Sequence, residues 1–403
     1  MADTRGLSLN RLDRIAEHLQ TRYLDTGRFP CAQVSVSRHG EQVWQCTLGK
    51  ADVERDKPLA ENTIFRIYSM TKPLTTVAFM MLVERGLVAL DDPVARYIPE
   101  WKNLGVFAGG TRGMFRTTPP ARPMQVVDLL RHTSGLTYGF QMRSNVDAAY
   151  RELEMEMGTK DRSLDAMIAA LGTLPLEFSP GTAWNYSVAT DVLGYLVGKI
   201  SGASFEDFLR GELLEPLGMV DTDFWVPEAK ADRLAACYVA TPEGGMKLAD
   251  DPAKSRLLRP ATYFSGGGGL VSTLADYNRF CRMLVEGGTL DGHRYLSRKT
   301  IELMGANHLP GHAYLPDLSV SMFAEATYNG VGFGLGFSVV EEPPLTMIPG
   351  SVGEMAWGGM ASTAFWLDPL EDMWVVFMTQ LMPSSTYPVR RELRTLVYSA
   401  LDD

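Results

Sequence analysis

The sequence contains few cysteines and no closely spaced pair of them. Only four occur among 403 residues, at Cys31, Cys46, Cys237 and Cys281, and no two form a Cys-x-x-Cys motif. So small and scattered a set excludes a disulfide scaffold. We expect all four side chains to be reduced and structural.

Long apolar runs and an excess of positive charge are also missing. No window reaches the roughly 18 apolar residues of a membrane span, and the first 20 residues lack the apolar stretch of a secretory signal. These absences predict a protein with no membrane span and a cytoplasmic location. The formal net charge is −10, which argues against nucleic acid as a partner because such binding depends on Lys and Arg neutralising phosphates.

Several familiar site motifs are absent as well. There is no HExxH and no cluster of Cys, His and carboxylates at ligand spacing, so we expect no metal and no cofactor. Gly266 to Gly269 fit neither a phosphate-binding GxxxxGK loop nor GxGxxG, and a flexible turn before a helix from Ala275 is expected there. His132 is expected to be a structural hydrogen-bonding residue. No GxSxG is present, which removes the α/β-hydrolase fold.

The chain does contain the composition of a globular protein, with 45% hydrophobic and 21% charged residues. Helical periodicity predicts amphipathic helices over 8–25 and near the C-terminus, and strand-like runs predict hairpins over 31–49 and 361–381. The segment from 87 to about 220 reads as helix and loop. We therefore predict an α/β (α+β) fold: residues 1–75 and 221–403 form an antiparallel sheet flanked by helices, and residues 76–220 form an inserted, mainly helical domain.

Ser69 and Lys72 stand three positions apart at the start of an apolar run, FRIYSMTKPLTTVAFMMLVERG. Residues i and i+3 share one face of a helix, so the amine of Lys72 can lie beside the Ser69 hydroxyl. A lysine that opens a buried helix is costly unless it has a partner or a use as a base. The alternative is that Ser69 only caps the helix while Lys72 extends to water.

Four stretches together make the chain resemble a known family. They are FRIYSMTKPLT with its SxxK motif, VVDLLRHTSGLTYG at 126–139, FSPGTAWNYSVATDVLGYLV at 178–197 and LLEPLGMVDTDFW at 213–225. From about residue 10 to 400 the chain resembles the serine β-lactamase and penicillin-binding protein superfamily, most closely its family VIII carboxylesterase branch. The resemblance implies a β-lactamase-like fold, with Ser69 as nucleophile and Lys72 as its base.

The resemblance also implies a catalytic tyrosine, from a YxN-like motif that here reads Tyr186-Ser187-Val188. A phenol, whose pKa is ordinarily ~10, can move protons if a neighbouring cation favours its phenolate, and Lys72 would be that cation. The alternative is that Tyr186 is a core aromatic residue. Val188 replaces the family's asparagine, which makes β-lactamase or peptidase activity less expected.

A third element is implied at Trp357-Gly358-Gly359, where β-lactamases have KTG. Two glycines allow the backbone to approach a substrate, and by analogy the N–H groups of Ser69 and Met360 would form an oxyanion hole. A simple Gly-Gly turn is the alternative. Because Trp357 replaces a cationic lysine, the expected substrate is a neutral small-molecule ester.

These inferences predict a serine carboxylesterase that cleaves short-chain neutral esters through an acyl-enzyme, with little or no β-lactamase activity. An acyltransferase or a β-lactamase/DD-peptidase of the same fold is the enzymatic alternative. A catalytically silent scaffold that binds peptides or self-assembles is the alternative from another class. The oligomeric state does not follow from the sequence.

Overall fold

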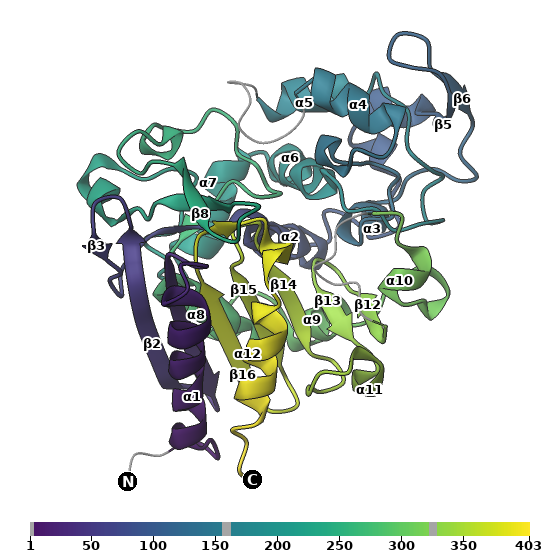
Figure 1. Cartoon of the computed structure of the whole chain (residues 1–403). Helices are drawn as coiled ribbons and strands as arrows, with labels where there is room; N and C mark the ends of the chain where they lie inside the picture. Colours follow the sequence, from purple (N-terminus) through teal and green to yellow (C-terminus); the bar gives the residue numbers. More distant parts are fainter. Residues whose placement is uncertain (1–3, 155–162, 322–328) are drawn as a thin grey trace.

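A computed structural model describes residues 4–154, 163–321 and 329–403. Its centre is an antiparallel sheet of eight strands in the order β12-β13-β14-β15-β16-β1-β2-β3 (Figure 1). The strands are β1 (Cys31–Arg38), β2 (Glu41–Asp52), β3 (Lys57–Pro58), β12 (Val331–Phe333), β13 (Ser338–Val340), β14 (Met355–Gly358), β15 (Ala364–Asp368) and β16 (Met373–Met378). Both ends of the chain thus build one sheet, which confirms the predicted fold class.

The two hairpins predicted from the sequence are present. β1 and β2 turn at His39 and Gly40, which have φ angles of 52° and 76°, as tight hairpins with the twist of the sheet require. β15 and β16 pair across the Pro- and Asp-rich turn, with Phe365 opposite Val376. β16 also pairs with β1, so the last strand of the sheet along the chain lies beside the first.

Helices cover both faces of this sheet. α1 (Leu9–Leu19) and α12 (Val389–Tyr398) lie side by side on one face, where Leu12, Ile15 and Leu393 are fully buried (Figure 1). The helix predicted over 8–25 continues beyond α1 as a π-helical turn, Gln20–Leu24. α8 (Leu274–Val285) packs against the other face, beginning one residue before the expected start.

α2 (Thr71–Glu84) lies at the centre of the molecule, between the sheet and the upper helices (Figure 1). Its residues from Thr71 to Leu82 are buried on every side, as the unbroken apolar run predicted. It packs against α6 (Ala189–Ser201) and α7 (Phe205–Leu209). α3 (Val126–Leu130), α4 (Asn145–Glu152) and α5 (Leu164–Leu171) complete this layer.

One hairpin in the middle segment was missed. β5 (Val106–Gly109) and β6 (Arg116–Thr118) pair within a region expected to be helix and loop. Gly109, Gly110 and Gly113 adopt positive φ and turn the chain; the flanking strands are too short to show a clear alternating pattern. The division into two domains, one of residues 1–75 and 221–403 and an inserted one of residues 76–220, stays a prediction.

The remaining elements are short. They are β4 (Phe65–Arg66) with β9 (Val271–Ser272); β7 (Cys237–Ala240) with β8 (Met246–Asp250) and β17 (Leu381–Met382); β10 (Thr289–Leu290) with β11 (His293–Arg294); and α9 (Arg298–Met304), α10 (Leu315–Leu318) and α11 (Pro343–Thr346). All four cysteines are free thiols.

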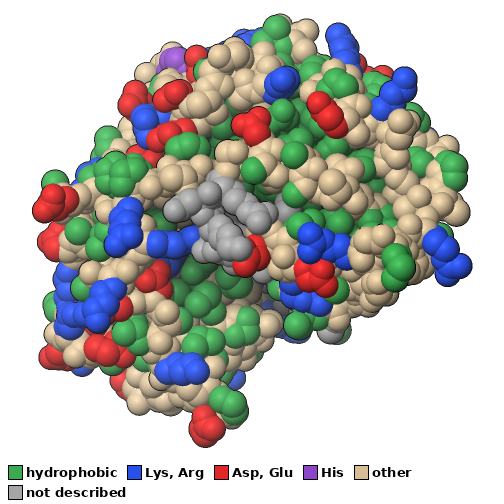
Figure 2. Space-filling model, turned by 90° about the horizontal axis from the view of Figure 1, so that it is seen from above, with side chains coloured by type: hydrophobic (Ala, Val, Ile, Leu, Met, Phe, Trp, Pro, Cys, Tyr) green, Lys and Arg blue, Asp and Glu red, His purple; other side chains and the backbone are tan. Residues whose placement is uncertain are grey.

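The surface charge and the lengths of the helices can be compared with what the composition predicted about nucleic acid and membrane spans. Seen from above, Lys and Arg side chains are interspersed with Asp and Glu, and hydrophobic side chains gather in hollows between them (Figure 2). Among the described residues, every helix is too short or too polar to cross a bilayer.

Candidate active site

Ser69 is held at the entrance to α2 by a short turn. The residue lies in a 3-10 turn, Tyr68–Met70, that leads directly into the helix. Tyr68 has a φ of 43°, a left-handed conformation that costs a non-glycine residue on the order of 1 kcal/mol. The half-buried Ser69 therefore stands in front of the positive end of the helix dipole, where a developing negative charge is favoured.

Lys72 reaches Ser69 from the first turn of α2. Its side chain is only 2% exposed, and its Nζ donates hydrogen bonds to Ser69 Oγ (3.4 Å), to the Tyr138 hydroxyl (3.1 Å) and to the Gly267 carbonyl oxygen (2.6 Å). Three acceptors match the three N–H bonds of an ammonium group. The structure thus excludes the alternative in which Lys72 extends to water.

Tyr186 approaches Ser69 from the loop that precedes α6. Its hydroxyl donates a hydrogen bond to Ser69 Oγ at 2.6 Å, and the centre of its ring lies 4.4 Å from Lys72 Nζ. The ring also packs against Trp357 with 5.6 Å between centroids. Tyr186 is therefore buried like a core aromatic residue, yet its polar end is directed at the serine. The structure brings Ser69, Lys72 and Tyr186 into one cluster.

Two further groups in this cluster were missed by the sequence reasoning. Tyr138 shares Lys72 as a hydrogen-bond partner, and it lies near the end of the 126–139 stretch that already carried the family resemblance. The carboxylate of the fully buried Asp191 accepts hydrogen bonds from Ser265 Oγ (2.5 Å) and from the Gly267 N–H (3.1 Å). Burial raises the pKa of Asp191, against these hydrogen bonds and the charge of Lys72.

The glycine run at 266–269 is more than the flexible turn that was expected. Gly266 and Gly267 are buried, and a Cβ on Gly267 would lie 2.4 Å from the Asp191 carboxylate. The run packs this tightly because its carbonyl groups accept hydrogen bonds from side chains of α2. The Gly266 oxygen accepts from Thr75 Oγ1 (2.8 Å), and the Gly267 oxygen accepts from Lys72. Glycine is needed here for close approach.

His132 lies beside the cluster as a buried structural residue. One of its ring nitrogens is 3.2 Å from Ser187 Oγ, and its ring packs against Tyr186 with 5.1 Å between centroids. Burial, with the nearby charge of Lys72, lowers the pKa of His132 well below its usual value. The side chain is therefore neutral near pH 7. Among the described residues, no group of His, Cys, Asp and Glu is placed to hold a metal ion.

The end of β14 borders the site, packed against the turn that holds Ser69. Trp357 is 5% exposed and packs edge-to-face on Phe333, which gives the site an apolar wall. A Cβ on Gly359 would lie 2.4 Å from the Ile67 carbonyl oxygen, so this glycine is needed for the strand end to approach the Ser69 turn. Met360 follows directly and is 40% exposed. In the described part of the chain, neither the Ser69 nor the Met360 amide donates to a backbone acceptor.

Comparisons with known proteins cover most of the chain. The Beta-lactamase family model matches residues 12–399. An uncharacterized protein of Mycobacterium tuberculosis is 37% identical over 339 residues, covering 83% of this chain and 82% of the relative. Esterase EstB of Burkholderia gladioli is 30% identical over 392 residues, covering 90% and 89% of the two chains.

A solved structure shows the same fold over nearly the whole chain. It is described as "EstCE1, a hydrolase with promiscuous acyltransferase activity", and it superposes with a TM-score of 0.79 at 25% identity, covering 97% of this chain and 98% of that one. The family model and these relatives together match nearly the whole length of the chain. The chain therefore belongs to the β-lactamase family of serine hydrolases, within the group that resembles the family VIII esterases.

Proposed function

We propose that the protein is a carboxylesterase that hydrolyses short-chain neutral carboxylic esters through an acyl-enzyme on Ser69. The observation that carries this proposal is the pair of hydrogen bonds on Ser69 Oγ, from Tyr186 at 2.6 Å and from Lys72 at 3.4 Å. A serine hydroxyl is a weak nucleophile by itself and needs a neighbouring group that accepts its proton. The name of the EstB relative supports ester hydrolysis.

The reaction would follow the order that this cluster allows. For attack the pair must have lost one proton, so that Tyr186 is the phenolate that the Lys72 cation favours. Ser69 Oγ then attacks the ester carbonyl carbon while its proton passes to the Tyr186 oxygen. The N–H groups of Ser69 and Met360 stabilise the oxyanion that forms. The pair then returns a proton to the departing alcohol, leaving an acyl group on Ser69. Water attacks this acyl group by the same route and releases the carboxylic acid.

The apolar wall supports a neutral acyl group as the preferred substrate. Trp357 packs against both Tyr186 and Phe333 beside the catalytic cluster, and apolar surroundings favour uncharged groups because they cannot offset the desolvation of a charge. A cytoplasmic location, expected from the sequence, remains a prediction.

Labelling with a fluorophosphonate tests the nucleophile. We expect one adduct, on the peptide that contains residues 67–72, and no adduct and no ester hydrolysis with Ser69→Ala. A protein that takes no label and cleaves no ester would instead be a silent scaffold. An adduct on another serine would contradict the assignment.

Acyl transfer is a second candidate function, favoured by the acyltransferase activity in the description of EstCE1. The two reactions share the acyl-enzyme and differ only in whether water or an alcohol accepts the acyl group. Hydrolysis of an aryl ester with and without an added alcohol separates them. A new ester product that accumulates faster than the free acid would favour the transferase.

A further inference from the structure

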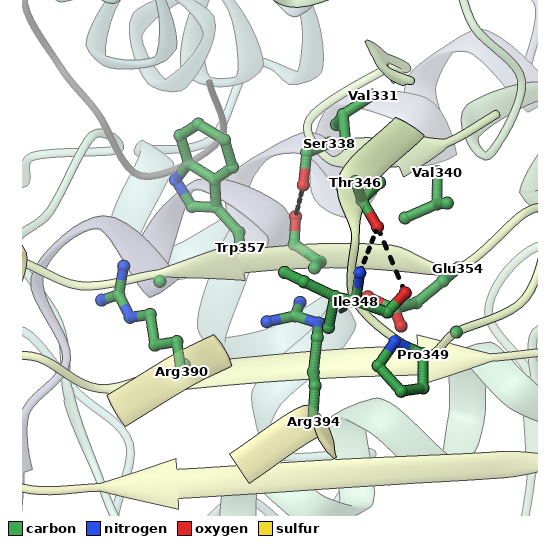
Figure 3. A pocket seen from close by; sticks show the side chains of 14 residues that line it. Val331, Ser338, Val340, Thr346, Ile348, Pro349, Glu354, Trp357, Arg390 and Arg394 are labelled. Carbon is green, nitrogen blue, oxygen red and sulfur yellow. Dashed lines mark hydrogen bonds and ion pairs between the residues drawn. The ribbon is translucent and has the colours of Figure 1, made fainter. Parts of the chain in front are cut away.

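Arg390, in the first turn of α12, reaches the end of β14 from the side away from Ser69. Its Nη2 donates hydrogen bonds to the carbonyl oxygens of Gly359 (2.8 Å) and Thr363 (2.6 Å). Figure 3 shows Arg390 and Trp357 on opposite sides of the strand. Arg390 also borders a cavity of about 60 Å³ on that side, which is separated from the catalytic cluster by β14.

The carbonyl that Arg390 binds belongs to the same peptide group as the Met360 N–H. This peptide is trans, because Met382-Pro383 is the one cis bond among the described residues. In a planar trans peptide, the C=O and N–H bonds point in opposite directions. A Gly359 carbonyl held toward α12 therefore directs the Met360 N–H away from α12, to the side of Trp357 and Tyr186.

The turn that contains this peptide is fixed at both ends. The Gly359 N–H donates to the Thr363 carbonyl oxygen at 2.9 Å, and Arg390 bridges the same two residues through their carbonyl groups. A Cβ on Gly358 would lie 2.5 Å from the Arg390 guanidinium carbon, so the cation lies directly against the strand backbone. The Gly359 carbonyl oxygen also accepts a hydrogen bond from the Ser362 N–H at 3.1 Å, so rotation of the 359–360 peptide would break this bond and the contact with Arg390.

A cation on the carbonyl oxygen also changes the strength of the amide as a donor. Hydrogen bonds in a chain polarise one another, so a guanidinium that draws electron density to the Gly359 oxygen makes the Met360 N–H a better donor. Donors that are oriented before the reaction stabilise a developing oxyanion without reorganisation.

We propose that Arg390 is a positioning residue for the oxyanion hole: it orients and polarises the Gly359–Met360 peptide so that the Met360 N–H stabilises the tetrahedral intermediate. This inference rests on the proposed esterase function. Arg390 acts through the peptide and from the far side of β14, so it is expected to affect the transition state and not the binding of the neutral ester.

Arg394 provides a matched control. It lies one turn further along α12 and borders the same cavity, but its Nε donates to Glu354 Oε1 at 2.9 Å, away from the 359–363 turn. Arg394→Met removes the same charge from the same helix face while leaving the Gly359 carbonyl with Arg390.

The test compares Arg390→Met, Arg390→Lys and Arg394→Met with the wild type on a butyrate aryl ester. For Arg390→Met we expect kcat to fall roughly 10- to 100-fold with KM within about twofold, since loss of a whole oxyanion donor typically costs about 10²–10³. Affinity for an alkyl boronic acid, which forms an anionic tetrahedral adduct with serine, should fall in parallel with kcat. Arg390→Lys retains a cation and should recover most of both, and Arg394→Met should keep kcat.

Three results would overturn the proposal. The first is an Arg390→Met enzyme with wild-type kcat. The second is an Arg390→Met enzyme in which kcat and KM worsen to the same extent, with the same change in Arg394→Met. This would mean that α12 only stabilises the fold. The third applies if Arg390→Met does not fold. In that case the proposal is overturned by a folded Arg390→Lys enzyme in which the affinity for the boronic acid does not change in parallel with kcat. A wild type that neither takes a fluorophosphonate nor cleaves esters would instead refute the proposed function, and this inference with it.

Discussion

Tyr186 combines the two properties that identify a functional side chain inside a core. Its ring is as buried as any structural aromatic residue, at 1% exposure, and its hydroxyl reaches the one half-buried serine of the cluster. A buried phenol ordinarily finds a fixed backbone partner. Here its partner is Ser69 Oγ, an atom that can itself act as a nucleophile. The buried ring therefore holds the hydroxyl against the atom expected to react.

Replacing Tyr186 by phenylalanine separates these properties. The ring keeps its packing against Trp357 and Lys72 while the hydrogen bond to Ser69 is lost. We expect kcat/KM for a short-chain ester to fall ~10²–10⁴-fold, the usual range for a lost proton-transfer group, with little change in melting temperature. Tyr97→Phe, which removes a surface hydroxyl bonded to Asp92, is the control. A rate within a few-fold of wild type would make Tyr186 a structural residue.

The sequence predicted the residues that carry motifs and missed those that only assist them. Ser69, Lys72 and Tyr186 stand in recognisable contexts, and the structure brings their polar ends together. Gly267 contributes only backbone atoms, a carbonyl oxygen to Lys72, which is 195 positions away along the chain, and an N–H to Asp191. Such contacts cannot be read from residue identity. Asp191 lies in the first turn of α6, and in a helix an acidic residue is normally expected on the solvent side. Its role depends on packing that only the fold creates.

At the scale of elements, the site depends on how closely the end of β14 approaches the Ser69 turn. A Cβ on Gly359 would meet both the Ile67 carbonyl oxygen and Thr363 Oγ1 at 2.4 Å, and the Ile67 oxygen is a backbone atom that cannot retreat without moving its own segment. The apparent Gly-Gly turn is therefore a contact between two elements that are nearly 300 residues apart.

Gly359→Ala should consequently displace the strand end from the catalytic serine. We expect at least a ~10-fold loss in kcat, because small misplacements of catalytic groups have large costs, together with a lower melting temperature. Gly211→Ala is the matched control, since nothing lies within 4 Å of its added Cβ, and it should behave as wild type. An active Gly359→Ala enzyme would mean that the Met360 amide takes no part in the reaction.

The segment after α3 is anchored by one buried carboxylate. Asp128 is fully buried and accepts hydrogen bonds from Arg122 (2.6 and 2.7 Å) and Arg131 (3.0 Å). The chain that follows is bonded to the Tyr186 loop, through Asn185 N–H to the His132 carbonyl (2.9 Å) and Val188 N–H to the Thr137 carbonyl (3.2 Å). Asp128 thereby supports both Tyr138 and Tyr186.

Asp128→Asn should destabilise the protein in a pH-dependent way. Although burial opposes its ionisation, the hydrogen bonds from Arg122 and Gln125 hold the pKa of Asp128 below its usual value. The stabilisation is then present above the unfolded pKa of about 4 and is lost as the pH falls through the lower folded pKa. We expect the variant to lose ~3–5 kcal/mol at pH 7, less in strong acid.

Chemical denaturation at pH 7 and at about pH 3 measures this difference. The exposed Asp165, in the first turn of α5, provides the control, since Asp165→Asn should change stability by less than about 0.5 kcal/mol. Equal losses at both pH values would show that the carboxylate is not stabilised by its ionisation.

At the scale of the whole molecule, the sequence predicted which segments form the sheet and the helical layers better than it predicted the order of the strands in the sheet. α2, which has almost no polar face, was expected to be buried, and its residues from Thr71 to Leu82 are. The strand order could not be predicted from periodicity, because β16 pairs with its neighbour β15 along the chain and also with β1, whose residues lie more than 300 positions away. The resemblance to a family predicted the fold class, and no strand order was predicted from it.

The choice between esters and β-lactams depends on which charges surround the whole cleft. A β-lactam carries a carboxylate and usually an amide side chain, which lactam-cleaving members of the family meet with a lysine and an asparagine. The sequence resemblance predicts Trp357 and Val188 at these positions, and Val188 is 1% exposed, with its side chain in the hydrophobic core. Arg390, whose guanidinium lies against the strand end, is already engaged with the Gly359 and Thr363 carbonyls from the other side of β14.

We therefore expect kcat/KM for a butyrate aryl ester to exceed that for penicillins or cephalosporins by at least ~10³, which corresponds to roughly 4 kcal/mol of transition-state discrimination. Steady-state rates on both substrate classes with one enzyme preparation give this ratio directly, and Ser69→Ala gives the background for each. Slow hydrolysis of some cephalosporins is compatible with it, because the serine chemistry is the same. Comparable kcat/KM values would mean that a cation does reach the lactam carboxylate. A selective loss of lactam cleavage in Arg390→Met would then identify that cation as Arg390, acting on the substrate and not through the peptide.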